Sequence, residues 1–238
     1  FFGAPSALAR LDDRPIAFWA THQAWLLYGD HAGSAGGLRE GKATVFEGGV
    51  RVPFIARWPG KIRGGSLCRE PAMTIDLWPT LARLVGGELP KHRIDGRDIW
   101  PLLAGEAGAK SPHEALFFYW EDELQAVRSG PWKLHFPHAY THPGPVGRSG
   151  EPGKMNRPRI ETTLFNLEKD RAETKDVAAR HPEIVSRLKV LADRMRQDLG
   201  DSAGKIKGNG TRPTFSSLGV ARTAATRPTF SSLGTASS

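Results

Sequence analysis

The chain is poor in cysteine and has no long apolar run. Its 238 residues include a single cysteine, Cys68, which excludes an internal disulfide framework and any Cys-x-x-Cys metal knuckle. The most apolar stretch, residues 16–28, is interrupted by His22 and Gln23 and is too short to span a bilayer. The opening residues also lack the basic, apolar and small-residue regions of a signal peptide. Since the chain starts at Phe1 rather than methionine, we expect it to be part of a longer protein, and its sequence indicates no compartment.

The formal charge of +8 is divided evenly between two segments of very different length. Residues 201–238 hold five Lys or Arg and one acidic residue, Asp201, which gives +4; the first 200 residues hold 28 basic and 24 acidic groups, which also gives +4. The long segment is therefore only mildly basic, and the high charge does not indicate nucleic-acid binding. A basic nucleic-acid binder remains an alternative that only the charge of residues 201–238 supports.

Three segments have clear patterns of secondary structure. Residues 52–58 are an apolar run closed by Pro59-Gly60 and predict a buried strand. Residues 74–85 predict a helix with one apolar face. Residues 182–199 predict a longer helix, because Pro182 suits the first helical position and Gly200 suits the end.

Short runs rich in aromatic and β-branched residues indicate a small antiparallel sheet. The four expected strands are residues 115–120, 124–128, 132–136 and 162–167.

The last segment differs in kind, since a nonapeptide at 211–219 recurs unchanged at 226–234 and Ser, Thr, Gly and Ala dominate. This composition predicts that residues 201–238 are disordered.

Several local motifs come close to catalytic patterns without meeting them. Residues 36–43 nearly match the phosphate-binding P-loop, but Ala43 replaces the hydroxyl residue, and Gly48, Gly49 and Pro53 prevent the helix that the motif needs. Cys68 is expected to be an ordinary buried or half-buried thiol. The histidines are expected to be surface or hydrogen-bonding residues rather than ligands, namely His31, His113, His135, His138 and His142.

A longer pattern is more specific. Residues 28–60 read YGDHAGSAGGLREGKATVFEGGVRVPFIARWPG, which resembles the sulfatases of the arylsulfatase A and N-acetylgalactosamine-6-sulfatase type. The shared pattern is L-R-x-G-K-x-x-x-x-E-G-G-x-R-x-P followed by W-P-G. The likeness continues in order through residues 74–81, 94–96, 126–133 and 164–170, and covers about residues 24–200.

The resemblance implies an α/β fold, namely the C-terminal half of the alkaline-phosphatase-like sulfatase fold with a small antiparallel sheet and a long helix. In that family a formylglycine made from Cys or Ser in C/S-x-P-S-R attacks the sulfur of a sulfate ester. A divalent cation, expected to be calcium, and cationic side chains stabilise the sulfate oxygens. The lysine of the Gly-Lys pair binds the sulfate, so the resemblance gives Lys42 the catalytic and substrate-binding role.

The sequence also departs from the family pattern. It contains no C/S-x-P-S-R, and Thr21-His22-Gln23 stands where the family places an Asp-Asn metal ligand pair. No metal ligand is therefore assigned, and we expect this chain alone to be inactive.

We expect a sulfated small molecule or carbohydrate as substrate, with no nucleic-acid or membrane partner; the oligomeric state is left open. The alternative is a noncatalytic sulfatase-derived binding or structural module.

The same resemblance predicts how the chain is divided. Residues 1–110 would form the end of the catalytic domain, with residues 1–23 matching poorly. Residues 111–200 would form the C-terminal subdomain, and residues 201–238 the disordered tail.

Overall fold

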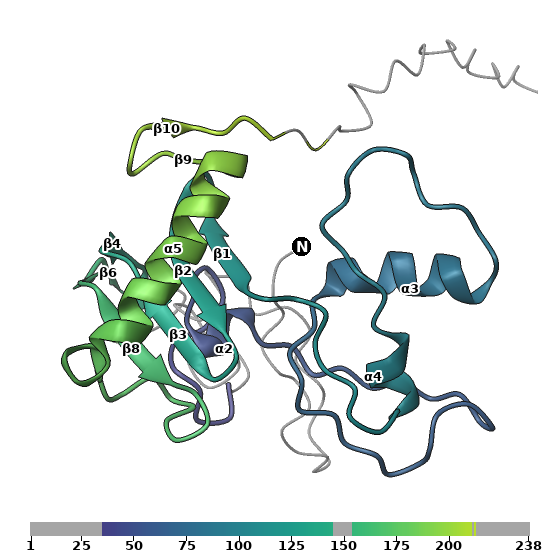
Figure 1. Ribbon diagram of the computed structural model, residues 1–238. Coiled ribbons are helices and arrows are strands. Elements are labelled where there is room, and N and C mark those ends of the chain that lie inside the picture. The colour runs from purple at the N-terminus through teal and green to yellow at the C-terminus, as the bar shows by residue number, and fades with distance from the viewer. Residues whose placement is uncertain (1–34, 145–153, 211, 213–238) are drawn as a thin grey trace, which may run out of the picture.

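The computed structural model describes residues 35–144, 154–210 and 212. Figure 1 shows two lobes, one built on a sheet and helix α5, the other on long loops with helices α3 and α4. The four-stranded sheet lies in the first lobe, in the order β1-β2-β3-β8 with every pair antiparallel. Its strands are β1 (Leu116–Trp120), β2 (Glu123–Ser129), β3 (Trp132–His135) and β8 (Thr163–Asn166). The antiparallel sheet expected from the sequence is confirmed.

Helix α5 (Pro182–Leu199) covers one face of this sheet. Its buried residues Leu188, Leu191 and Ala192 pack against a group of apolar sheet residues. That group includes Leu124, Val127, Leu134 and Leu164. The expected helix is confirmed at both ends, with Pro182 in its first turn and Gly200 at φ 93°, a conformation that favours glycine.

The short helix α2 (Glu47–Val50) lies on the opposite face of the sheet (Figure 1). Phe46, immediately before it, packs with Ile160, Phe165 and Leu167 in a second apolar cluster. Because successive strand residues point to opposite faces, β3 directs Leu134 toward α5, whereas Lys133 and His135 lie on the α2 side. The sheet is thus buried on both faces.

Short elements complete the first lobe. The strand pairs are β4 (His138–Ala139) with β7 (Arg159–Ile160), β5 (His142–Pro143) with β6 (Met155–Asn156), and β9 (Gly200–Asp201) with β10 (Ile206–Lys207). A 3-10 helix, η3 (Ala178–Arg180), precedes α5. Asp201 of β9 and the whole of β10 lie within residues 201–238, the segment predicted to be disordered. Residues 211 and 213–238, including nearly all of the repeats, lie outside the described residues.

The second lobe contains η2 (Thr74–Asp76), α3 (Leu77–Leu84) and α4 (Trp100–Ala104). Buried Asp76 organises this lobe. Its carboxylate accepts hydrogen bonds from the backbone N–H of Met73 at 2.7 Å and of Arg97 at 2.9 Å, and lies 2.8 Å from His113 Nε2.

The lobes are joined by ion pairs in which Arg212 meets Asp95 at 2.7 Å and Asp198 at 2.8 Å. None of the helices in the described part of the chain is both long and apolar enough to cross a membrane.

The strand expected at residues 52–58 does not form. The segment has no regular secondary structure, and its large apolar side chains are exposed, with Ile55 at 78% and Phe54 at 54%. A strand needs a neighbouring strand to satisfy its backbone groups, and no described segment pairs with this one. Helix α3 likewise exposes Trp78 and Leu81, and Val85 just after it is exposed as well; these residues belong to the apolar face expected from the pattern. Cys68 is exposed rather than buried, which corrects the expectation for that thiol.

Candidate functional site

Lys42 lies in a tight turn of residues 40–43, called the Lys42 turn below. The first and last residues of this turn are in the left-handed backbone region. Glu40 has φ 56° and Ala43 has φ 74°, values that cost residues other than glycine conformational energy. The Thr44 hydroxyl donates to the Gly41 carbonyl at 2.9 Å, and the Gly48 N–H donates to the Arg39 carbonyl, also at 2.9 Å. The turn therefore folds back onto the start of α2, leaving the Lys42 side chain half-buried.

The two glycines of α2 make this close return possible. A Cβ at Gly49 would lie 2.5 Å from the Gly41 carbonyl oxygen and 2.7 Å from the Thr44 hydroxyl oxygen. A Cβ at Gly48 would meet the carbonyl oxygens of Arg39 and Glu40 at still shorter separations. The two glycines are thus required by the approach of the Lys42 turn to the helix.

A buried ion cluster lies beside α2 and consists of Glu47, Lys133, Glu173 and His135. The Lys133 ammonium is 2.9 Å from Glu47 Oε1 and 3.0 Å from Glu173 Oε1, and it also donates to the Val45 carbonyl at 2.7 Å. The four side chains are at most 1% exposed. Lys133 comes from β3 and Glu173 from the loop after β8, so the cluster joins the Lys42 turn to the C-terminal sheet.

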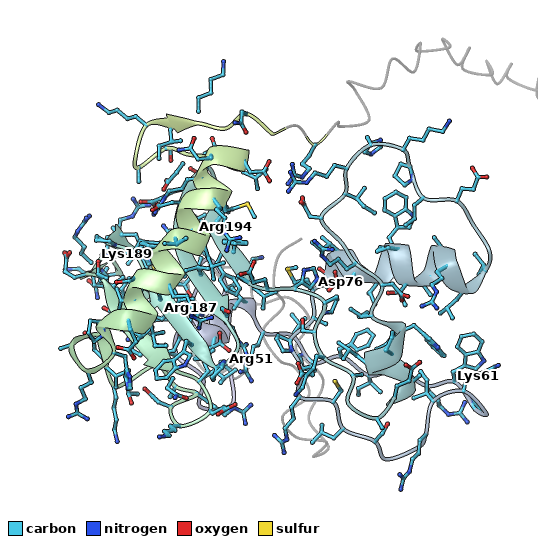
Figure 2. The ribbon with its side chains drawn as sticks, viewed as in Figure 1. Arg51, Lys61, Asp76, Arg187, Lys189 and Arg194 are labelled. Carbon is cyan, nitrogen blue, oxygen red and sulfur yellow. The ribbon has the colours of Figure 1, made fainter. Side chains whose placement is uncertain are left out.

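Arginines surround the cluster and the turn. Arg51, which Figure 2 labels beside the sheet, pairs with Glu47, and Arg128 lies 3.7 Å from the same carboxylate. Arg39 donates to the Glu173 carbonyl at 2.8 Å, and its guanidinium carbon stacks 4.2 Å from the Phe46 ring centre. Arg51 and Arg128 thus add positive charge beside Glu47, whereas Arg39 binds the backbone of Glu173.

The carboxylates of Glu47 and Glu173 are held ionised. Burial opposes their ionisation, but the Lys133 ammonium and the hydrogen bonds to each carboxylate together outweigh it. Hydrogen bonds act in the same direction: Lys133 donates to Glu47, and His135 and the Glu47 N–H donate to Glu173. The pKa of each carboxyl therefore lies below its ordinary value.

His135 is held neutral. Burial lowers the pKa of His135 to about 4, despite the opposing hydrogen bond from its Nε2 to Glu173 at 2.9 Å. Burial also lowers the pKa of neighbouring His138, whose Nδ1 lies 2.7 Å from the Phe136 carbonyl oxygen. Within the described part of the chain, Nδ1 of His135 and Nε2 of His138 have no hydrogen-bond partner. Both rings pack against Phe46, and the His135 ring centre lies 4.7 Å from that of Phe46.

We expect stability to fall with acidification before the carboxyl groups titrate. An unfolded histidine binds a proton near pH 6.5, whereas folded His135 binds one only near pH 4, so the unfolded state gains protons in this window. Linkage gives a loss of about 2 kcal/mol of unfolding free energy from His135 between about pH 7 and about pH 5. His138 adds to the loss. Urea unfolding at the two pH values measures it.

The matched variant is His135→Gln, which removes the titration and keeps an N–H donor for Glu173. Its unfolding free energy should fall less than the wild-type value over the same pH interval, by the contribution of His135. An equal fall in both proteins would show that His135 does not take up the proton.

No metal centre is present among the described residues. Within residues 35–144, 154–210 and 212, no group of three or more His, Cys, Asp or Glu side chains is placed to hold a metal ion. These residues therefore do not fit the divalent-cation site that the resemblance implies, and no step below uses a metal.

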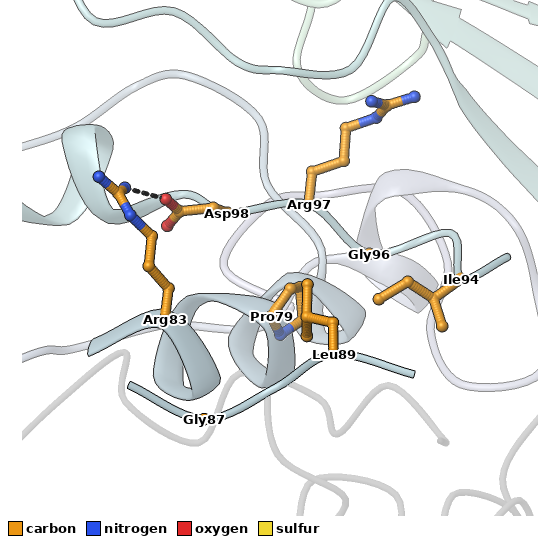
Figure 3. Close-up of a pocket in the computed structure, with 8 residues that line it drawn as sticks. All are labelled: Pro79, Arg83, Gly87, Leu89, Ile94, Gly96, Arg97 and Asp98. Atoms are coloured by element: carbon orange, nitrogen blue, oxygen red, sulfur yellow. Dashed lines mark hydrogen bonds and ion pairs between the residues drawn. The ribbon is translucent and has the colours of Figure 1, made fainter. Parts of the chain in front are cut away.

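One surface pocket lies away from the residues just described. It has a volume of about 560 Å³ and is lined by residues of α3 and of segment 87–98. Figure 3 shows Arg83 paired with Asp98 at its edge, above Pro79 and Leu89. None of its lining residues belongs to the Lys42 turn or to the buried ion cluster.

The sequence pointed to Lys42 but not to the cluster that surrounds its turn. Of the histidines considered, His135 and His138 are buried in the first lobe, whereas His142 is at the surface with Nδ1 2.9 Å from Glu40; His31 lies outside the described residues. The available signal for the cluster was the alternation in β3, which places Lys133 and His135 on one face of a strand whose other face is apolar. The partner Glu173 comes from a loop and carries no such signal.

Comparisons with known proteins agree with this architecture. A family model described as the C-terminal region of aryl-sulfatase matches residues 111–216, and one described as the C-terminal part of N-sulphoglucosamine sulphohydrolase matches residues 40–134. Human arylsulfatase A is 37% identical over 198 residues, covering 77% of this chain and 38% of the relative. Rat steryl-sulfatase is 39% identical over 179 residues, covering 68% of this chain and 31% of the relative.

Solved structures show the same relationship. The sulfatase PsFucS1 from Pseudoalteromonas sp. superimposes with a TM-score of 0.56 at 26% identity, over 66% of this chain and 32% of that one. The chain thus spans about a third of the length of the relatives that it matches. With the two family models together extending from residue 40 to residue 216, the chain belongs to the sulfatase family and corresponds to the C-terminal portion of its members.

Proposed function

We propose that this chain supplies the sulfate-binding part of an enzyme that hydrolyses sulfate esters, with the Lys42 ammonium contacting a sulfate oxygen. The observation that carries the proposal is the strained turn of Lys42, whose neighbours Glu40 and Ala43 adopt left-handed conformations without being glycine. Such strain persists only where surrounding contacts enforce it and is concentrated at functional sites. Here the buried ion cluster and the two close-packed glycines supply those contacts.

The chemistry of the turn suits a sulfate monoester. An ammonium is a compact charge that pairs with an anionic oxygen from many directions, and nearby backbone N–H groups of glycine-rich turns add to the field that an anion experiences. During hydrolysis the charge on the sulfate oxygens shifts as the ester S–O bond breaks. A cation fixed beside one of those oxygens stabilises the transition state without reorganising.

In this scheme the reaction is shared between this chain and the rest of a sulfatase domain. The sequence contains no C/S-x-P-S-R from which a formylglycine nucleophile forms, and the described residues hold no metal site. We therefore propose that nucleophile and divalent cation, expected to be calcium, come from sequence outside these segments, and that the substrate is a sulfated small molecule or carbohydrate.

Sulfate binding by Lys42 is tested directly on the purified chain. We expect sodium sulfate to shift the backbone amide NMR signals of residues 41–43 saturably, with a dissociation constant on the order of millimolar, as suits a single ammonium contact to an anion. Sodium chloride at equal ionic strength should not reproduce the shifts. Lys42→Ala should abolish them.

The control is Lys61→Ala, which removes an equal charge from an exposed loop at the far end of the second lobe (Figure 2). It should leave the sulfate response unchanged. Saturable shifts that survive in Lys42→Ala, or that chloride produces equally, would overturn the proposed role. A noncatalytic module would be indicated instead if the wild-type chain shows no sulfate response.

A further inference from the structure

Three charged residues from distant parts of the chain meet in the interior of the first lobe. Glu47 begins α2, Lys133 lies in the centre of β3, and Glu173 lies in the loop between β8 and η3. Each is 0–1% exposed, and Lys133 lies within 3.0 Å of a carboxylate oxygen of both glutamates. Within the buried ion cluster, these three residues form a three-way junction that is fully removed from solvent.

The junction holds the Lys42 turn on both sides, before it through the Arg39 side chain and after it through the backbone of Val45 and Glu47. Before the turn, Arg39 donates to the carbonyl oxygen of Glu173 at 2.8 Å. After the turn, the Glu47 N–H donates to the Glu173 carboxylate at 2.6 Å, and the Val45 carbonyl accepts from Lys133 at 2.7 Å. A single residue, Glu173, therefore clamps both ends of the segment that contains Lys42, through its backbone and its side chain.

Glu173 is itself strained. Its φ is 53°, a left-handed conformation for a residue with a Cβ, and its side chain is completely buried. Both features cost free energy. Glu40 and Ala43 carry the same backbone strain at the other end of these contacts.

Stability alone does not account for this arrangement. Charges lose their hydration when buried, and apolar residues of similar volume usually stabilise an interior as well or better. Apolar contacts, however, are non-directional, whereas hydrogen bonds from Lys133 and to Glu173 fix the backbone at Val45 and Glu47 in one place. A charged junction therefore holds the backbone of the Lys42 turn in one position, which apolar contacts would not do.

We propose that Lys133 and Glu173 are positioning residues, through which the C-terminal sheet sets the place of the sulfate-contacting lysine. The inference rests on the proposed function for the role of Lys42, but the hold on the turn is separately measurable. Through these two residues the C-terminal sheet is part of the anion site and not only a structural support. Neither residue is expected to touch the substrate.

The test compares two full-length variants that weaken opposite faces of the same sheet. Lys133→Met removes the ammonium while keeping the length of the side chain. Leu188→Ala opens a cavity between α5 and the sheet, where Leu188 is fully buried in the first apolar core. Hydrogen exchange of backbone amides in residues 38–46 reports the hold on the turn, and the sulfate titration of residues 41–43 reports its consequence.

In Lys133→Met, exchange of residues 38–46 should accelerate by about tenfold or more, and the sulfate dissociation constant should rise by a similar factor. In Leu188→Ala, exchange in α5 should accelerate while the turn and its sulfate affinity change little. If Lys133→Met does not fold, Glu173→Gln replaces it; this variant keeps the side-chain shape and one acceptor oxygen and should show the same localised change. Lys133→Arg, which restores a cation with a different geometry, should recover part of the sulfate affinity.

Equal effects of Lys133→Met and Leu188→Ala on the turn would overturn the inference, because the cluster would then contribute only to overall stability. An unchanged turn in both Lys133→Met and Glu173→Gln would also overturn it. A wild-type chain that shows no sulfate response would instead contradict the proposed function, and the exchange rates would still decide whether the junction holds the turn.

Discussion

Alanine at Gly49 is expected to lower the free energy of unfolding by about 3 kcal/mol or more, among the largest effects of a single methyl group in this protein. The new Cβ would lie 2.5 Å from the Gly41 carbonyl oxygen and 2.7 Å from the Thr44 hydroxyl oxygen. The first of these atoms belongs to the backbone and cannot rotate away, so the Lys42 turn would have to leave α2. Gly48→Ala should behave similarly, because its Cβ would meet two other carbonyl oxygens.

The control for these variants is Gly64→Ala. An added Cβ at Gly64 meets no atom within 4 Å, and no left-handed φ is required there. Its effect should stay within about 0.5 kcal/mol of the wild-type value. Urea unfolding followed by tryptophan fluorescence measures all three proteins. If Gly49→Ala is as stable as Gly64→Ala, the close return of the turn onto α2 is wrong.

Loss of the Lys42 ammonium is expected to reduce turnover about a hundredfold to a thousandfold in a complete active site. The test joins the amino-terminal two-thirds of a sulfatase ahead of this chain and assays an aryl sulfate in calcium buffer. Removing a preorganised charge from a reacting oxyanion has an effect of this size, whereas removing an ordinary loop lysine changes stability by under about 0.5 kcal/mol and leaves the rate unchanged. Lys42→Ala should therefore keep the melting temperature of the fusion and lose most of its rate.

Two further proteins make the result specific. Lys42→Arg should recover only part of the rate, because a planar guanidinium places its charge differently from a compact ammonium. Lys61→Ala should retain full turnover. The unfused chain should show no turnover above buffer. Near-normal turnover of the Lys42→Ala fusion would contradict the assignment, and turnover by the unfused chain that Lys42→Ala abolishes would show that it contains a nucleophile.

The sequence predicted those elements whose determinants are local. Helix α5 carries its own start and stop signals in Pro182 and Gly200, and the sheet strands carry aromatic and β-branched runs separated by a turn at Gly130. Residues 52–58 failed as a strand because pairing depends on a partner that their own sequence does not contain. The same dependence on other segments explains why the apolar face of α3 is exposed rather than packed.

For the candidate site, sequence and structure contributed different parts. The family resemblance singled out Lys42, but neither the left-handed conformations around it nor its clamp could be read from residue types alone. Lys133, in the Trp-Lys-Leu-His strand, looks like a solvent-facing lysine until a second layer, α2, is known to cover that face. Glu173 is one acidic residue in a charged loop, and only its three-dimensional contacts distinguish it from Glu168 or Asp170 nearby.

The place of Glu173 restricts how the chain can vary in length. Loops usually tolerate insertions and deletions, since their exact path matters little to the core. The loop that follows β8, however, must deliver a carboxylate to within 3.0 Å of Lys133 and a carbonyl to within 2.8 Å of Arg39. One residue more or fewer between Asn166 and Glu173 would withdraw both and leave a buried ammonium with a single carboxylate. Among sulfatases that share this junction, residues 166–173 should therefore keep a constant length even where their side chains differ.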